Sequence, residues 1–216
     1  MFVSIIAIIL LLVPQANTII TSLATEFVCA HYYLQYGQQK QEILGNIDRL
    51  VEYISEHETD TRLHFHTYSY GSLIAMDYLF PFGKKPSGNM LTKSEALITI
   101  GTPFDFISSY YSNYFVRRSS DLESKIKWLN VYSVADALGS NFRNDTEAGE
   151  AEYGLSQDGL KPININYEVM KLNEQSLTNF IMLNSLKVHT MYWPKGVDGQ
   201  SCVNLIYSQM KSEGLF

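Results

Sequence analysis

The stretch RLHFHTYSYGSLIAMDYLFP, residues 62–81, decides the fold expected of this chain. Its first part, Leu63 to Tyr68, is short, aromatic and rich in residues that favour strands. From Tyr70 the apolar residues recur at helical spacing until Pro81 ends the pattern. Ser69 stands between the two patterns. A serine on a sharp strand-to-helix turn is held clear of its neighbours at the positive end of the new helix, which suits it to nucleophilic attack.

The composition indicates one globular domain spanning residues 1–216. Hydrophobic residues make up 46% and charged residues 18%, which is ample for a core. The formal net charge is −6 and the basic residues are scattered apart from Arg117 and Arg118. Nucleic-acid binding needs a basic face, so we expect no nucleic-acid partner.

The N-terminal run Phe2–Val13 (FVSIIAIILLLV) is almost wholly apolar and has two interpretations. It can be a strand of a parallel sheet, buried on both faces, which fits a cytoplasmic protein. It can also be a signal or membrane anchor, which fits a secreted or membrane-associated protein. The run lacks a preceding Lys or Arg and falls short of the roughly 20 residues of a membrane span, so we favour the strand.

Strand and helix patterns alternate along the chain. This alternation predicts an α/β fold with a mostly parallel central sheet and helices on both faces. The expected strands are Ile5–Val13, Phe27–Tyr33, Leu63–Tyr68, Ala96–Ile100, Ile126–Val134 and Ile163–Val169. The expected helices are Thr18–Glu26, Lys40–His57, Tyr70–Phe80, Glu174–Leu186 and Ser201–Lys211, the last with Val203, Ile206, Tyr207 and Met210 on one side. Pro14–Asn17, Gly83–Lys93 and the acidic stretch Gly139–Lys161 are expected to be loops.

A catalytic serine needs a base, usually histidine, and a carboxylate that orients the base. Of the five histidines only His189 lies downstream of Ser69, in a loop near the end. Among the downstream aspartates, Asp136 directly follows an expected buried strand. Because active groups gather at the carboxyl ends of parallel strands, Ser69, Asp136 and His189 are the expected triad.

The order Ser69, Asp136, His189 resembles the α/β-hydrolase superfamily, and its lipase- and esterase-like members in particular. Ser69 and Gly71 match the nucleophile turn, Asp136 the acid loop and His189 the late histidine loop. Gly101-Thr102-Pro103 resembles a turn common after the next strand in lipase-like members. The chain resembles a minimal or N-terminally short version of this family.

The resemblance also implies an oxyanion hole, and here the sequence departs from the family. One donor is expected from the Tyr70 amide and the second from Gln15 or Ala16, in the loop after the first expected strand. That loop lacks the family's His-Gly or Gly-Gly pair. The family pattern G-x-S-x-G begins here with Thr67.

The remaining features have less specific interpretations. The aromatic segment Phe104–Phe115, including Phe106 and Tyr110, is either a core helix or the lining of an acyl pocket. His64 and His66 share one face of a strand and are expected to pack beneath helices, since no third zinc ligand is evident. Cys29 and Cys202 are expected to be buried free thiols.

These patterns predict a serine hydrolase that cleaves carboxylic esters with apolar or lipid-like acyl groups. It needs no metal and no cofactor, and it can associate with membranes through the apolar N-terminus. Two alternatives stay open. One is a non-catalytic protein of the same fold that binds an apolar ligand or a protein partner, which the atypical oxyanion loop favours. The other is an acyltransferase with the same triad.

Overall fold

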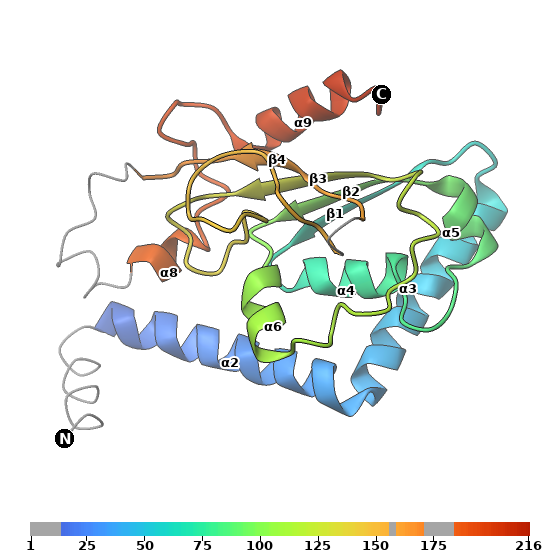
Figure 1. Ribbon diagram of the computed structural model, residues 1–216, viewed down its shortest axis with the longest axis horizontal. Coiled ribbons are helices and arrows are strands. Elements are labelled where there is room, and N and C mark those ends of the chain that lie inside the picture. Colours follow the sequence, from blue (N-terminus) through green and yellow to red (C-terminus); the bar gives the residue numbers. More distant parts are fainter. Residues whose placement is uncertain (1–13, 156–158, 171–183) are drawn as a thin grey trace.

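A four-stranded parallel sheet forms the centre of the molecule (Figure 1). The computed structural model describes residues 14–155, 159–170 and 184–216. The strands lie side by side in chain order, and every pair is parallel. They are β1 (Leu63–Tyr68), β2 (Ser94–Ile100), β3 (Lys127–Tyr132) and β4 (Ile163–Asn166). The predicted α/β class with a parallel sheet is therefore confirmed.

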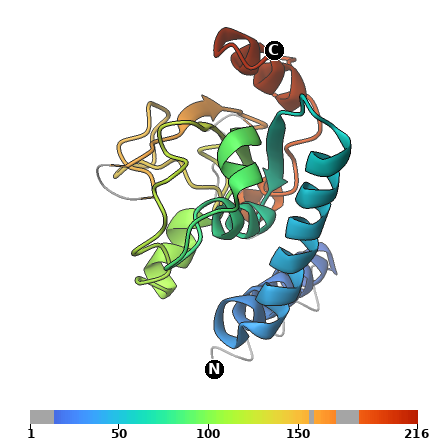
Figure 2. The same cartoon turned by 90° about the vertical axis from the view of Figure 1, so that its right-hand side faces the viewer.

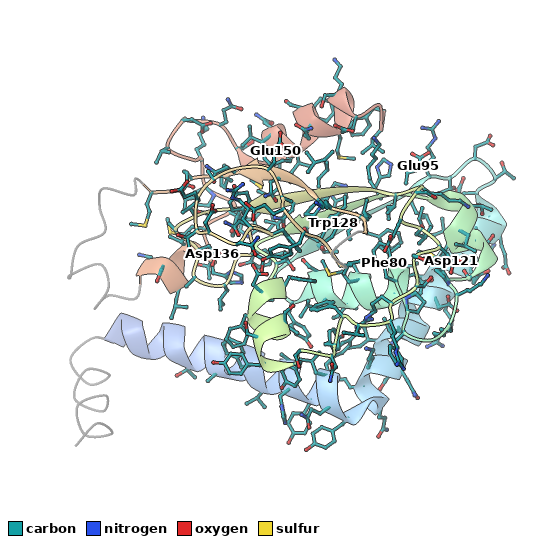
Figure 3. The ribbon with its side chains drawn as sticks, viewed as in Figure 1. Phe80, Glu95, Asp121, Trp128, Asp136 and Glu150 are labelled. Atoms are coloured by element: carbon teal, nitrogen blue, oxygen red, sulfur yellow. The ribbon has the colours of Figure 1, made fainter. Side chains whose placement is uncertain are left out.

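One face of the sheet is covered by helices from the first half of the chain. These are α3 (Gln38–His57), α4 (Gly71–Leu79), α5 (Gly88–Lys93) and α6 (Phe104–Tyr110), and α2 (Pro14–Tyr36) lies farther from the sheet, beyond α4 and α6 (Figure 1). Alternate strand residues point to this face, so Leu97 of β2 and Trp128 of β3 pack with Leu73 and Met76 of α4. Trp128 is labelled beneath the strands in Figure 3. Its indole N–H donates to Thr99 Oγ1 over 3.0 Å, which satisfies the polar atom of this buried ring.

The opposite face is covered by α9 (Cys202–Ser212), and the short α8 (Asn184–Val188) lies near the carboxyl ends of the strands (Figure 1). Strand residues such as Ile98 and Leu129 pack there against Ile206 and Met210. Ser201 begins α9 as an N-cap, because its side chain accepts from the Asn204 amide. The predicted stripe of α9 is wrong in part. Cys202, Ile206 and Met210 are buried, whereas Val203 and Tyr207 are exposed.

The N-terminal region differs most from the sequence prediction. Pro14–Asn17, expected as a loop, and Phe27–Tyr33, expected as a strand, both belong to the single helix α2. Ala30 and Tyr33 are buried three residues apart, and half-buried Leu34 follows, so this segment presents one helical face to the rest of the molecule. Tertiary packing of that face overrides the strand preference of the aromatic residues. The expected strand Ile5–Val13 lies outside the described residues.

Several smaller boundaries also differ. Part of the expected loop Gly83–Lys93 is the helix α5, which Ser87 caps. The strand expected over Ile163–Val169 ends at Asn166. Most of the helix expected over Glu174–Leu186 lies outside the described residues. Both cysteines are free as predicted, but Cys29 is exposed on α2 and only Cys202 is buried.

Candidate active site

Ser69 lies on a strained turn between β1 and α4. Its φ of 50° is in the left-handed region, which residues other than glycine rarely adopt. The Ser69 amide donates to the Ile100 carbonyl at the end of β2 over 2.8 Å, which holds the turn against the sheet. Thr67 Oγ1 donates to the Ile98 carbonyl over 2.9 Å. The Thr67 hydroxyl therefore has a hydrogen-bond partner at the position where the G-x-S-x-G pattern has glycine.

The three side chains singled out in the sequence meet at the carboxyl end of the sheet. Ser69 Oγ lies 2.7 Å from His189 Nε2. His189 Nδ1 lies 2.9 Å from Asp136 Oδ2 and 3.1 Å from Oδ1. His189 and Asp136 are both buried, and Asp136 is labelled near the strand ends in Figure 3. The arrangement is a serine, a base within hydrogen-bond reach, and a carboxylate that orients the base.

Further contacts fix the histidine and the carboxylate. The Tyr192 hydroxyl donates to Asp136 Oδ2 over 2.7 Å, and the Leu138 amide donates to Oδ1 over 2.9 Å. The Tyr68 hydroxyl donates to the His189 carbonyl over 2.6 Å. Burial, together with the negative charge of Asp136, raises the pKa of Tyr192 well above its ordinary value, so this hydroxyl stays a donor. Tyr192 was not predicted from the sequence, although its position three residues after His189 was an available signal.

Glycine at positions 101 and 139 leaves the space that the Asp136 and Tyr192 side chains occupy. A Cβ on Gly139 would lie 2.6 Å from Asp136 Oδ2. A Cβ on Gly101 would lie 2.8 Å from the Tyr192 ring, and Gly101 also has a φ of 55°. Any larger residue at these positions would push against the carboxylate or its tyrosine partner. Gly101 belongs to the turn that the sequence analysis singled out, whereas Gly139 was expected only as part of a loop.

The Tyr70 amide stands at the start of α4, directly after Ser69. Among the described residues it has no hydrogen-bond partner, which leaves it free to donate to a ligand. The Tyr70 side chain anchors the turn to α2, since its hydroxyl donates to the Ala30 carbonyl over 3.1 Å and its ring meets that of Tyr33 edge to face. The predicted second donors, Gln15 and Ala16, lie in the first turn of α2 rather than in a loop. Their contacts fall outside what the structure describes.

A large pocket of about 1420 Å³ lies beside Asp136, which is one of its lining residues. The three predicted pocket residues, Phe104, Phe106 and Tyr110, all line it, together with the Val134–Asn141 loop and polar residues such as Arg143. Phe104 is at the same time buried in the core, and Tyr110 is 72% exposed. Ser69 and His189 are not among the lining residues, so a role of this pocket in substrate binding stays a prediction.

Within the described ranges, no group of three or more His, Cys, Asp or Glu side chains is placed to hold a metal ion. His64 Nε2 instead lies 3.4 Å from Glu95 Oε2. No helix in the described part of the chain is long and apolar enough to span a bilayer.

Comparison with protein-family models, with curated proteins and with solved structures found no match to this chain. Any functional conclusion therefore depends on the geometry of the site itself.

Proposed function

We propose that this protein is a serine hydrolase that cleaves carboxylic esters and favours apolar or lipid-like acyl groups. The proposal rests on one observation above all. Ser69, His189 and Asp136 form a continuous hydrogen-bonded chain, with the serine on a strained turn at the start of a helix. Backbone strain that the surrounding structure holds in place is typical of functional sites.

The geometry supports a two-step acyl transfer to water. Ser69 Oγ attacks the ester carbonyl while His189 Nε2 takes the serine proton. His189 then returns that proton to the leaving alcohol, and the acyl group stays bound to Ser69. A water molecule, activated by the same nitrogen, releases the acid. Asp136 accepts from Nδ1–H throughout, which holds the imidazole in the tautomer with Nε2 free and stabilises its charged form.

The oxyanion of each tetrahedral intermediate needs donors that are in place beforehand. The free Tyr70 amide is one such donor. The Gln15 and Ala16 amides are poorly placed as the second donor, because they lie about 20 Å along α2 from Ala30, the residue that the Tyr70 hydroxyl contacts. The preference for apolar acyl groups rests on the aromatic side chains of α6 beside the site.

An activity-based probe tests this function directly. A fluorophosphonate should label the wild-type protein at Ser69, with loss of fluoride. Ser69→Ala should abolish labelling and lower the hydrolysis of a p-nitrophenyl ester by about 10⁴- to 10⁶-fold, because the nucleophile is gone. The circular dichroism spectrum and melting temperature serve as the control for folding.

The two alternative functions, a non-catalytic binding protein and an acyltransferase, predict different results. Wild-type protein that folds but neither reacts with the probe nor hydrolyses any p-nitrophenyl ester would contradict the proposal and favour a non-catalytic binding protein. An acyltransferase would react with the probe but release the acyl group faster to an added alcohol or amine than to water. Mass spectrometry of the products separates these cases.

A further inference from the structure

Tyr192 joins two parts of the candidate active site that are separate in the sequence. It lies with His189 in the segment between α8 and α9, which leads from the carboxyl ends of the strands to the face of the sheet opposite α4 (Figure 1 and Figure 2). Its side chain is fully buried. Its hydroxyl donates to Asp136 Oδ2 over 2.7 Å and accepts from the Ser133 amide over 3.1 Å. One oxygen therefore links the end of β3 to the carboxylate that orients the base.

Asp136 Oδ2 accepts from two donors at the same time. Besides the Tyr192 hydroxyl, His189 Nδ1–H donates to it over 2.9 Å, and this second bond orients the imidazole. Both bonds are assisted by the same negative charge, so a strong bond from one donor weakens the bond from the other. The Tyr192 hydroxyl thus limits how far the carboxylate stabilises the charged form of the imidazole.

The surroundings make Tyr192 a strong and well-placed donor. The Ser133 amide donates to the phenol oxygen and so polarises its O–H bond toward Asp136. Because burial raises the pKa of Tyr192 well above its ordinary value, the hydroxyl stays protonated. A Cβ on Gly139 would lie 3.0 Å from this oxygen, so little space is left for it to move. The Asp136 side chain is not exposed at all, which keeps water from competing with the two donors.

Other titratable groups near the imidazole come from separate elements. Tyr68 at the end of β1 stacks its ring on that of His189 at 5.7 Å. Lys187 in the last turn of α8 is exposed, so water and salt screen its charge. Glu168 after β4 forms two hydrogen bonds with the loop that leads from β3 to Asp136. Of these charged groups, Asp136 is the one that hydrogen-bonds to the imidazole, so a change in its bonding acts on the base directly.

On its pocket side, Asp136 shares the lining with further charged residues. Asp105 of α6 accepts from the Tyr153 hydroxyl over 2.8 Å, and burial raises the pKa of this carboxyl. Arg143 pairs with Asp145 over 2.7 Å. These charges are bonded to partners of their own, whereas Tyr192 bonds to Asp136 itself.

We propose that Tyr192 is a positioning residue that, through its hydrogen bond to Asp136, keeps the His189 imidazole neutral and able to accept the Ser69 proton at a lower pH than the Asp136–His189 pair alone would allow. Tyr192 acts through Asp136 rather than on the ester. The inference rests on the proposed function, since it assigns the pH range of that reaction to a residue outside the triad. The hydrogen bonds that carry it are present in the resting protein, where they can be measured without a substrate.

Two replacements that change the Tyr192 hydroxyl in opposite ways test the proposal. Tyr192→Phe removes the donor, whereas 3-fluorotyrosine, introduced at position 192 by amber suppression, is a stronger donor because its phenol is more acidic. The His189 Nδ1–H proton is followed by NMR in resting protein labelled with ¹⁵N-histidine. Its resonance should move downfield in Tyr192→Phe, since Asp136 then accepts more strongly from His189, and upfield with fluorotyrosine.

The pH dependence of fluorophosphonate labelling gives a second readout. Labelling requires a neutral base, so its rate falls at low pH as the imidazole becomes charged. The midpoint of this fall should move up by about 0.5–1 pH unit in Tyr192→Phe and move down with fluorotyrosine. A residue that only stabilises the fold would not shift the midpoint in opposite directions.

Tyr167 offers the matched control. Its buried ring stacks on Tyr192 at 6.2 Å, but its hydroxyl donates to the Pro194 carbonyl rather than to Asp136. Tyr167→Phe thus removes a buried hydroxyl from the same cluster without changing the bonds of the carboxylate. It should leave both the resonance and the midpoint at their wild-type values.

An unchanged resonance in both Tyr192 variants, or a shift in the same direction in both, would overturn the proposal. If Tyr192→Phe does not fold by circular dichroism, the fluorotyrosine protein decides alone. An upfield shift then supports the proposal and an unchanged resonance overturns it. Wild-type protein that folds but is neither labelled nor active would contradict the proposed function, and the NMR readout would still show whether Tyr192 acts on His189. The two failures are therefore distinguishable.

Discussion

At the scale of single residues, the position of the Asp136 carboxylate depends on space that glycine leaves. Gly139→Ala would place a Cβ 2.6 Å from Asp136 Oδ2, so the carboxylate must move from His189 or from Tyr192. We expect kcat/KM for a p-nitrophenyl ester to fall about 10- to 100-fold, since a hydrogen bond to a charged group contributes about 1.5–3 kcal/mol. Gly88→Ala is the matched control, because its Cβ meets nothing within 4 Å. Equal activities of the two variants would show that the position of the Asp136 carboxylate does not limit activity.

The two cysteines should differ sharply in reactivity. Burial raises the pKa of the Cys202 thiol to about 12, whereas Cys29 is exposed on α2. Only the thiolate reacts with disulfide reagents, and at pH 8 about one Cys202 thiol in 10⁴ is ionised. We therefore expect Ellman's reagent to titrate one thiol per native chain and two after denaturation. Two fast-reacting thiols in the native protein would contradict the packing of α9 on the sheet.

At the scale of elements, a buried carboxylate joins the helices beneath the sheet. Asp77 of α4 accepts from the Tyr33 hydroxyl of α2 over 2.8 Å and pairs with Lys40 of α3 over 2.7 Å. It also contacts Tyr114 and Arg118 of the segment after α6. Burial, followed by the negative charge of Asp77, raises the pKa of Tyr33 above its ordinary range, so the phenol remains a donor. One side chain thus holds together elements that are far apart in the sequence.

Removal of this carboxylate should be costly. Asp77→Ala leaves the half-buried Lys40 and the buried Arg118 without their shared partner, and breaking a buried pair typically costs about 3–5 kcal/mol. Urea denaturation should report a loss of that size in the free energy of unfolding. Tyr33→Phe deletes only one neutral donor and should cost about 1–2 kcal/mol. A loss below 1 kcal/mol in Asp77→Ala would mean that the network does not stabilise the fold.

At the scale of the whole molecule, the sequence prediction succeeded where a pattern is local and strong. β1, β2 and β3 and the helices α3, α4 and α9 lie within a few residues of their expected positions, because each has a clear period and a clear end signal. The prediction failed for Phe27–Tyr33, where aromatic residues favour a strand but tertiary packing forms a helix. It also grouped Val203 and Tyr207 on one side of α9 with Ile206 and Met210, although only Ile206 and Met210 are buried, since spacing cannot tell which side of an apolar helix faces the sheet.

The sequence by itself determined the α/β class, the turn at Ser69 and the order of the three candidate catalytic residues. These follow from local periodicity and from the rule that active groups gather at the carboxyl ends of parallel strands. Only the tertiary structure decided that Ser69, His189 and Asp136 lie within hydrogen-bond distance. It alone revealed that Tyr192 holds the carboxylate. Such contacts join residues far apart in the chain, and no local pattern encodes them.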